Sequence, residues 1–219
     1  MTPNQGSVYA LCDVNSFYVA CERLFRPDLK DKPVVVLSNN DGCAIAMCSF
    51  SKSLGIKIGT PYFEIKPLLK RYNIEWFSSN YGLYGDISQR FNWVLQQFTD
   101  KVAPYSVDES FLLFEGFNGD LNEHCLNLKN TVWDWLSLPI CVGLGPTKTL
   151  AKVANYYAKK HKQSTDGVVN LCSSRNRKWA LEHLAVEDIW GIGRRLSQKL
   201  KLQRIYTAWD LHNCDYKTL

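Results

Sequence analysis

Residues 8–24 read VYALCDVNSFYVACERL, and this stretch determines how the chain begins to fold. Val8 to Asp13 is a short apolar run that ends at a carboxylate, which is typical of a buried strand. The apolar residues that follow it recur at helical spacing: Phe17, Ala20, Cys21 and Leu24. We therefore expect a strand, a tight turn and a helix, with Asp13 at the point where the strand ends.

The rest of the chain alternates between strand and helix patterns. Further strands are expected at residues 33–38, 102–107, 111–114, 139–145 and 167–171. Further helices are expected at residues 43–54, from Pro61 onward, around 87–98 with Asp86 in the first turn, and over 121–136 and 147–161. Because several strands return as hairpins instead of repeating one βαβ unit, the predicted class is α+β, followed beyond Leu171 by an all-helical module.

Composition is that of a globular protein, and the charge is divided unevenly along the chain. Of the 219 residues, 46% are apolar and 13% aromatic, enough to build a real core. Residues 1–145 carry 12 Lys and Arg against 15 Asp and Glu, a net −3, whereas residues 146–219 carry 14 against 6, a net +8. This asymmetry favours a polyanionic partner at the C-terminal end; a solvated basic face is the alternative.

The sequence disfavours a membrane protein and a disulfide-rich or zinc-binding protein. No run approaches the roughly 20 apolar residues needed to cross a bilayer, and residues 1–12 lack a secretory signal, so we expect a cytoplasmic protein with no membrane partner. The eight cysteines are scattered without a CxxC pair, and the four histidines do not fall at zinc-finger spacing from them. Reduced and mostly buried thiols are therefore expected.

Three carboxylates form the first candidate site. Asp13 stands at a strand end, and the adjacent pair Asp108-Glu109 lies between two expected strands. Carboxylates gathered at one sheet edge repel one another unless cations lie between them, and oxygen ligands suit Mg²⁺ held partly by substrate phosphates. Two such ions would clamp the attacking and leaving oxygens of a phosphoryl transfer. The alternative is that these are ordinary solvated acids at strand ends.

Tyr18 is a candidate for contact with a bound nucleotide. It follows Asp13 by five residues and lies at the start of the expected helix. A helix N-terminus presents backbone N–H groups to phosphates, so an aromatic side chain there would lie close to the sugar. An ordinary core or surface tyrosine is the alternative.

Two basic features follow in the C-terminal part of the chain. Lys148, Lys152 and Lys159 are offset by four and seven residues, which places them on one face of the expected helix. Residues 190–195, WGIGRR, place two glycines and two arginines at a helix start, where backbone N–H groups and charge can bind phosphate. We interpret this segment as a helix-hairpin-helix clamp on a nucleic-acid backbone. A solvated helix face and an ordinary helix-helix turn are the alternatives.

In their order along the chain, these motifs resemble one family. The stretches that carry the resemblance are ALCDVNSFYVACERLFRPDL, KPVVVLSNNDGCAIA, SKSLGIKIGTPYF, FSSNYGLYGDIS, YSVDESF, VGLGPTKTLAKVAN and VEDIWGIGRRLSQKL. They run from about Tyr9 to about Leu202. The chain resembles the N-terminal portion of Y-family translesion DNA polymerases, and within them the UmuC-type branch, the catalytic subunit of bacterial DNA polymerase V.

The resemblance implies a site for two Mg²⁺ ions and an incoming dNTP. The implied catalytic and magnesium-binding residues are Asp13, Asp108 and Glu109, joined for the metal by the Val14 carbonyl. The implied nucleotide-binding residues are Phe17, Tyr18, Lys52 and Lys159, with Tyr18 as the steric gate against ribonucleotides. The expected DNA-binding residues are Lys148, Lys152, Gly191, Gly193, Arg194 and Arg195. The implied reaction is template-directed, error-prone DNA synthesis in damage tolerance and SOS mutagenesis, by attack of a primer 3′-hydroxyl on the α-phosphorus of a dNTP.

The resemblance also implies domains and partners. A palm is expected at residues 1–27 and 79–170, fingers at 28–78, and a partial helical thumb with the helix-hairpin-helix at 171–219, with the family's little finger absent. Primer-template DNA and a dNTP are the expected partners, and a UmuD-type dimer and RecA are candidates. Contact with a sliding clamp is expected to be lost with the missing C-terminal region.

Two other functions stay open on the sequence. One is a truncated, polymerase-derived DNA-binding or regulatory protein with little or no catalytic activity, which the absent little finger favours. The other is a palm-type nucleotide cyclase or another two-metal nucleotidyl enzyme without a DNA substrate. The basic C-terminal region and the WGIGRR segment disfavour it.

Overall fold

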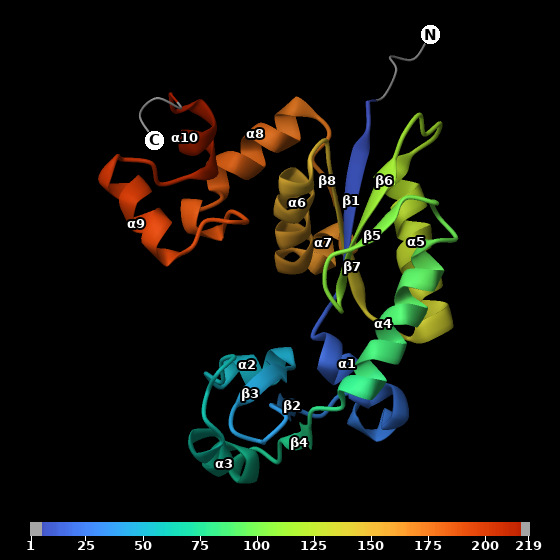
Figure 1. Ribbon diagram of the computed structural model, residues 1–219, viewed down its shortest axis with the longest axis vertical. Coiled ribbons are helices and arrows are strands. Elements are labelled where there is room, and N and C mark those ends of the chain that lie inside the picture. The colour runs from blue at the N-terminus through green and yellow to red at the C-terminus, as the bar shows by residue number, and fades with distance from the viewer. Residues whose placement is uncertain (1–5, 216–219) are drawn as a thin grey trace.

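A five-stranded sheet forms the centre of the molecule (Figure 1). The computed structural model describes residues 6–215. The strand order is β5-β6-β1-β7-β8. The strands are β1 Val8–Val14, β5 Val102–Pro104, β6 Glu109–Phe114, β7 Ile140–Gly145 and β8 Val168–Asn170. β1 is antiparallel to both of its neighbours, β5 is antiparallel to β6, and β8 is parallel to β7, which gives a mixed sheet with an antiparallel centre.

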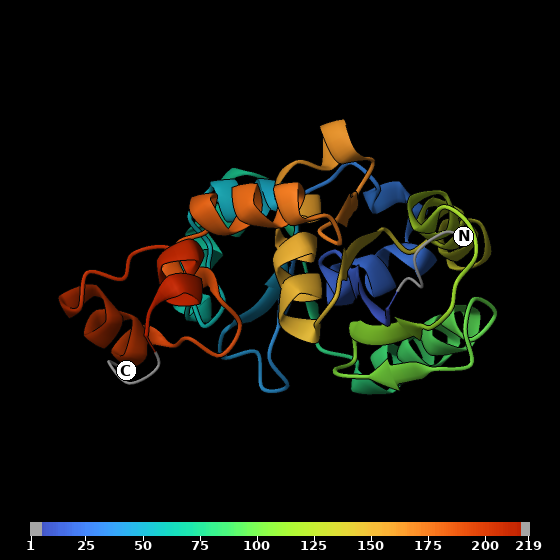
Figure 2. The ribbon, with the colours of Figure 1, turned by 90° about the horizontal axis from the view of Figure 1, so that it is seen from above.

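Helices cover both faces of this sheet. α4 (Tyr81–Leu95) and α5 (Leu121–Leu136) lie on one side, and α6 (Lys148–Lys160) lies on the other (Figure 1). α1 (Phe17–Phe25) begins just after β1 and contacts α4. Seen from above, the C-terminal helices extend from the side of the sheet away from α4 and α5 (Figure 2).

The alternation of side chains along β1 decides which of them face α6. The residues that pack into the core with α4 and α5 are Ala10, Cys12 and Val14. Leu11 packs instead with Phe111 and Ala151, on the α6 side of the sheet. Because side chains alternate along a strand, Asp13 faces α6 as well.

α6 lies close to β7 because the strand carries a glycine where the helix crosses it. A Cβ atom on Gly143 would lie 2.1 Å from the backbone nitrogen of Asn155, so any larger residue would push the helix away. The buried side-chain amide of Asn155 donates to the carbonyls of Leu11 and Cys141, at 3.2 and 3.0 Å. These bonds fix α6 across β1 and β7, and so fix its lysines relative to Asp13.

A second sheet of three strands has a small core of its own. Its order is β3-β2-β4. The strands are β2 Val34–Leu37, β3 Ala44–Met47 and β4 Glu75–Ser78. α3 (Tyr62–Arg71) packs on this sheet through Ile65 and Leu69. The helix expected from Pro61 is therefore present, with Pro61 as its N-cap.

The prediction of one helix over residues 43–54 is wrong. These residues form β3 and the short helix α2 (Ser49–Ser53). β3 pairs with β2 in antiparallel register, which places Met47 opposite Val35. Pairing satisfies the backbone groups of this buried segment, and that requirement outweighs the helical propensity of Ala-Ile-Ala-Met. β4, which pairs parallel to β2, is absent from the sequence-based expectations.

α4 begins earlier than the sequence predicted, so Asp86 does not lie in its first turn. The helix starts at Tyr81, and the side chain of Asn80 caps it by accepting the backbone N–H three residues on, at 3.1 Å. Gly82 and Gly85 lower the helix propensity of the first turns and hide the true start in the sequence.

Beyond β8 the described chain is helical, as expected. Its helices are α8 Ser174–His183, α9 Arg194–Leu202 and α10 Ala208–Asn213, with a 3-10 turn at Val186–Asp188. Two further short segments are the 3-10 turn Pro27–Leu29 and α7 Lys162–Thr165. One small core joins α8 and α10 to α6, and another lies between the 3-10 turn and α9. Within residues 6–215, no helix is long and apolar enough to cross a membrane.

Candidate active site at one end of the central sheet

The register of the central sheet brings the three candidate carboxylates together. Asp13 on β1 lies directly opposite Glu109 on β6. The backbone N–H of Val14 donates to the carbonyl of Asp108 at 2.9 Å. β5 ends at Pro104 and not at Val107 as expected, so Asp108 lies in the loop that leads into β6. Residues far apart in sequence therefore meet at one end of the sheet.

Asp13 is a buried carboxyl group, with 4% of its surface exposed. Burial raises the pKa of Asp13 to about 7; the nearby Lys159 opposes this rise and Glu109 adds to it. The Nζ atom of Lys159 lies 2.5 Å from Oδ2 of Asp13. The pKa of Asp13 therefore stays above its ordinary value even with Lys159 beside it, because burial penalises the charged form.

A second lysine of α6 holds Glu109. The Nζ atom of Lys152 donates to both carboxylate oxygens, at 3.1 and 3.0 Å. The side chains of this pair are largely buried, with 16% of Lys152 and 19% of Glu109 exposed. The same ammonium lies 4.4 Å from the ring centroid of Tyr105 and 5.3 Å from that of Trp190. α6 thus delivers one positive charge to each of two carboxylates.

Asp13 and Glu109 lie side by side with Asp108 next to them in the chain, and a lysine supplies positive charge beside Asp13 and beside Glu109. In the described part of the chain, no group of three or more His, Cys, Asp and Glu side chains is arranged to hold a metal ion. The carboxylate of Asp108 accepts a hydrogen bond from Ser106 Oγ at 2.6 Å. Hard divalent cations such as Mg²⁺ prefer oxygen ligands, so these carboxylates have the right chemistry for such an ion, although lysines pair with two of them in this structure.

Tyr18 lies in a group of aromatic rings at the start of α1. Its ring stacks on Tyr84, with centroids 4.2 Å apart and planes 17° apart, and meets Tyr81 edge-on at 6.1 Å. Tyr84 is buried and donates its hydroxyl to Glu22 at 2.7 Å. Burial, followed by the nearby groups of Tyr81 and Asp108, raises the pKa of Tyr18. Tyr18 thus packs against two other tyrosine rings and lies near enough to Asp108 to feel its charge.

The turn from β1 into α1 has an unusual backbone. Ser16 has φ 51° and ψ 52°, in the left-handed region that residues other than glycine rarely adopt. Its hydroxyl donates to the carbonyl of Met47 at 3.0 Å, which ties the turn to β3. Among the described residues no side chain caps the first turn of α1. The backbone N–H groups of Phe17 and Tyr18 therefore remain available to another acceptor.

The remaining candidate lysines lie at different places relative to the carboxylates. Lys148 lies one turn before Lys152, with its ammonium 5.3 Å from the ring centroid of Phe111. Lys148, Lys152 and Lys159 thus all face the same side of the sheet. Lys52 is exposed on α2, beside the three-stranded sheet, and no described contact joins it to the carboxylates.

The WGIGRR segment forms the turn between the 3-10 turn and α9. Gly191 has φ 93°, a conformation that favours glycine. Gly193 is the N-cap of α9, and Arg194 and Arg195 are its first two residues. All four residues are exposed.

Sequence reasoning assigned no role to three residues that help to position this site. Asn155 anchors α6, and Tyr105 and Trp190 enclose Lys152. The indole Nε1–H of Trp190 donates to the hydroxyl of Tyr105 at 3.2 Å, across 85 residues of sequence. The sequence could have drawn attention to the two aromatic residues, because Tyr105 begins the YSVDESF motif and Trp190 begins the WGIGRR motif.

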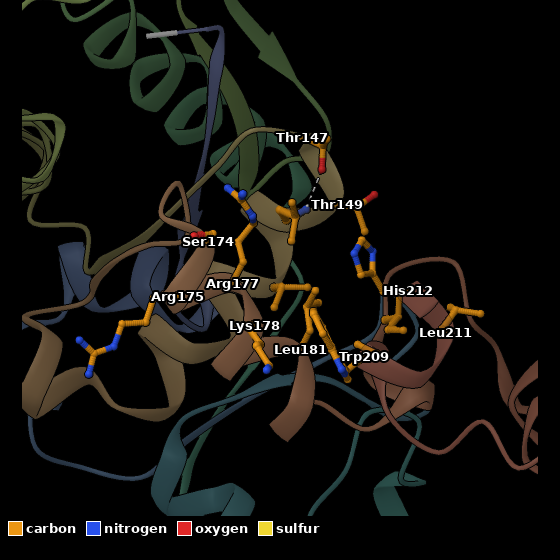
Figure 3. Close-up of a pocket in the computed structure, with 14 residues that line it drawn as sticks. Thr147, Thr149, Ser174, Arg175, Arg177, Lys178, Leu181, Trp209, Leu211 and His212 are labelled. Carbon is orange, nitrogen blue, oxygen red and sulfur yellow. Dashed lines mark hydrogen bonds between the residues drawn. The ribbon is translucent and has the colours of Figure 1, made fainter. Parts of the chain in front are cut away.

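A cavity of about 580 Å³ lies elsewhere, among α6, α8 and α10 (Figure 3). Its polar lining includes Thr147 and Thr149 from the start of α6, Arg175 and Lys178 from α8, and His212 from α10. The three carboxylates are not among the described residues that line it. We therefore place the candidate site at the end of the sheet and not in this cavity.

Comparison with known proteins links this geometry to a family. The impB/mucB/samB family matches residues 12–156, a span that contains the three carboxylates, Lys148 and Lys152 and ends before Lys159. The chain belongs to the impB/mucB/samB family. Protein UmuC of Salmonella typhimurium is 48% identical over 206 residues, covering 93% of this chain and 49% of the relative. The predicted resemblance to UmuC-type polymerases is confirmed.

Other relatives extend the impB/mucB/samB comparison. Protein MucB of Escherichia coli is 39% identical over 214 residues, covering 97% of this chain and 51% of the relative. DNA polymerase IV 2 of Bacillus subtilis is 29% identical over 221 residues, covering 93% of this chain and 50% of the relative. The chain therefore spans about half the length of the curated relatives it matches.

Solved structures share the fold of this impB/mucB/samB chain. The insertion ternary complex of Dbh DNA polymerase superimposes with a TM-score of 0.81 at 22% identity, covering 96% of this chain and 62% of that one. DinB from Sulfolobus solfataricus gives 0.78 at 22% identity, covering 96% and 61%. At this level of identity the likeness shows the mixed α/β fold.

Proposed function

We propose that this chain is the catalytic part of a translesion DNA polymerase, which transfers a nucleotide from a dNTP to a primer 3′-hydroxyl. The observation that carries the proposal is the position of Asp13 opposite Glu109, with Asp108 beside them, on a sheet face covered by a lysine-bearing helix. Family membership and relatives named DNA polymerase support the reaction class.

Mg²⁺ is the proposed cofactor, as two ions. Asp13, Asp108 and Glu109 would hold it together with the carbonyl of Val14. When bound, Mg²⁺ neutralises phosphate charge and stabilises the attacking and leaving oxygens of the transfer. The protein itself contributes mainly by positioning the primer and the dNTP. In this proposal the lysines of α6 are counter-ions that leave the carboxylates when substrate arrives.

The nucleotide would lie between α1 and α6. Lys159, once released from Asp13, would bind the triphosphate, and Lys52 would approach it from α2. The uncapped backbone N–H groups of Phe17 and Tyr18 would bind phosphate oxygens, as helix N-termini do. The ring of Tyr18, fixed by its stack, would exclude a 2′-hydroxyl.

The DNA would lie along the basic C-terminal part of the chain. The proposed DNA-binding residues are Lys148, Lys152, Gly191, Gly193, Arg194 and Arg195. The net charge of +8 over residues 146–219 supports this placement, because neutralised phosphates release condensed counterions. Residues 1–27 and 79–170 would then act as the palm, 28–78 as the fingers and 171–219 as part of the thumb.

The lysine pairs favour a second candidate function. Lys152 pairs with Glu109, and Lys159 pairs with Asp13, so two of the three carboxylates already have a positive partner. A polymerase-derived DNA-binding or regulatory protein would keep these pairs permanently and would not extend primers.

Primer extension separates the two functions. The wild-type chain, given primer-template, dNTPs and Mg²⁺, should extend the primer, and Asp108→Ala should reduce extension by roughly 100-fold or more because a metal ligand is lost. Asp134→Ala is the matched control, since Asp134 is an exposed acid on α5. DNA binding is measured for all three proteins by fluorescence anisotropy. If the wild type binds DNA but does not extend it, the regulatory function replaces the polymerase.

A further inference from the structure

Trp190 connects the C-terminal helices to the carboxylate site. It stands in the turn before α9, yet its indole N–H donates to the hydroxyl of Tyr105, in the loop that precedes Glu109. The two rings meet edge-on, with centroids 5.5 Å apart and planes at 90°. The ring of Trp190 also lies 6.0 Å from that of Phe111, on β6.

The two rings together enclose Lys152. Its ammonium lies over both of them, and aromatic faces attract a cation. With both rings in place, 16% of the Lys152 side chain is exposed. Without Trp190 this ion pair would become more exposed to water, where such pairs contribute little.

Lys152 and a divalent cation compete for Glu109. The ammonium of Lys152 donates to both carboxylate oxygens of Glu109, and its positive charge repels a second cation at the same oxygens. An ion that binds there therefore weakens the hold of Glu109 on Lys152 and disturbs the contacts that Lys152 makes with Tyr105 and Trp190. Cation binding at Glu109 and the packing of Trp190 on Lys152 both depend on the position of Lys152. The two events are therefore thermodynamically coupled.

We propose that Trp190 and Tyr105 form a latch that holds Lys152 on Glu109 and keeps a divalent cation away from that carboxylate until the turn before α9 moves. This inference rests on the proposed function of Glu109 as a metal ligand. Gly191, directly after Trp190, has φ 93° and open space around it, so the turn has a position that can change conformation with little steric hindrance. Engagement of DNA by the WGIGRR turn would open the latch, and cation binding would in turn loosen Trp190.

The test is the affinity of the free protein for Mn²⁺, measured by electron paramagnetic resonance of the unbound ion. Lys152→Gln should tighten binding, because the competing ammonium is gone. Trp190→Leu should tighten it by about tenfold, since the cation–π contact and the shielding of the ion pair are lost. Tyr105→Phe keeps the ring beneath Lys152 and loses the hydroxyl acceptor, so its effect should be smaller.

The double variant distinguishes a latch from a general structural effect. In the Lys152→Gln background, Trp190→Leu should leave the Mn²⁺ affinity unchanged, because Trp190 acts through Lys152. Lys160→Gln, which removes an equal charge from an exposed site on α6, and Trp209→Leu, which removes an indole from α10, should match the wild type.

The outcomes separate this inference from the proposed function. If Lys152→Gln tightens Mn²⁺ binding and Trp190→Leu does not, the latch is wrong and the metal site stands. If Trp190→Leu has the same effect with or without Lys152, the latch is also wrong. If Glu109→Gln binds Mn²⁺ as the wild type does in every background, both the metal site and the latch are wrong.

Discussion

Two lysines of α6 neutralise two carboxylates of the central sheet, and a stacked tyrosine lies beside them. Each of these side chains is held by its own element: Asp13 and Glu109 by strand register, the lysines by the close contact of α6 with β7, and Tyr18 by its stack on Tyr84. The backbone positions that carry the site are therefore set before any ligand arrives.

Replacement of Tyr18 should alter sugar selection. Tyr18→Ala removes the ring that would meet a 2′-hydroxyl, so the preference for dATP over ATP, as a ratio of kcat/KM in primer extension, should fall by roughly 10- to 100-fold. Tyr18→Phe keeps the stack on Tyr84 and should retain the preference. Tyr206→Ala, at an exposed tyrosine beside α10, is the control. An unchanged ratio in Tyr18→Ala would remove the steric-gate assignment.

Buried thiols should resist alkylation in the native protein. Burial raises the pKa of Cys12, and raises the pKa of Cys21 and of Cys125 to about 12, so almost none of these thiols is ionised at mildly alkaline pH. Partly exposed Cys43 and Cys214 should react with iodoacetamide first, as followed by peptide mass spectrometry. In denaturant all eight cysteines should react alike. Equal native rates would contradict the packing of the core.

The sequence singled out the carboxylates and Tyr18 as candidates because they lie in short motifs that carry the family resemblance, and their roles stay predictions. It did not identify the contact between Tyr105 and Trp190, which depends on where the C-terminal helices dock against the sheet. Nor could spacing show that Lys152 and Lys159 pair with Glu109 and Asp13, because that depends on the crossing of α6 over β1.

The contact between α6 and β7 positions the lysines, and it depends on a glycine. Since a Cβ on Gly143 would overlap the backbone of Asn155, Gly143→Ala should reduce the free energy of unfolding by about 3 kcal/mol, measured by urea denaturation. Gly85→Ala is the control, and it should change the free energy of unfolding in the opposite direction. Gly85 lies in α4 with open space around it, so alanine there should stabilise by about 0.5–1 kcal/mol. Equal effects of the two changes would contradict the close packing of α6.

Among the helices and strands, the spacing of apolar residues predicted those elements in which the spacing is regular. The strand at Val8, α5 and α6 appear close to their expected bounds because their apolar residues recur regularly. β3 was mistaken for a helix because its Ala-Ile-Ala-Met sequence suits both states, and pairing with β2 decides between them. β4 is a short strand with alternating burial, and its four residues carry too little signal alone.

Charge is separated over the whole molecule, with the excess of Lys and Arg in residues 146–219. The C-terminal helices that carry much of this excess extend from the side of the sheet away from α4 and α5 (Figure 2). At the carboxylate end of the sheet, lysines of α6 pair with Asp13 and Glu109. This arrangement suits a polyanion that lies along the C-terminal helices, with one end of the polyanion at the carboxylate end of the sheet.

Removal of Arg194 and Arg195 should therefore weaken the salt dependence of DNA binding. The double change to Ala should reduce the slope of log affinity against log salt by about 2, since each arginine is expected to neutralise one phosphate. Fluorescence anisotropy of labelled primer-template over a salt series measures the slope. The control, Lys66→Ala with Lys70→Ala, removes the same charge from exposed positions on α3. The same loss of slope in both proteins would contradict a specific contact at α9.

The most direct test of the account is a crystal structure of the chain with primer-template, a non-hydrolysable dNTP and Mn²⁺, with the ions located by anomalous scattering. The account predicts anomalous peaks between the carboxylates of Asp13, Asp108 and Glu109, with Lys152 and Lys159 withdrawn from them. A structure that contains the nucleotide but shows no peak there, with both lysine pairs intact, would contradict it.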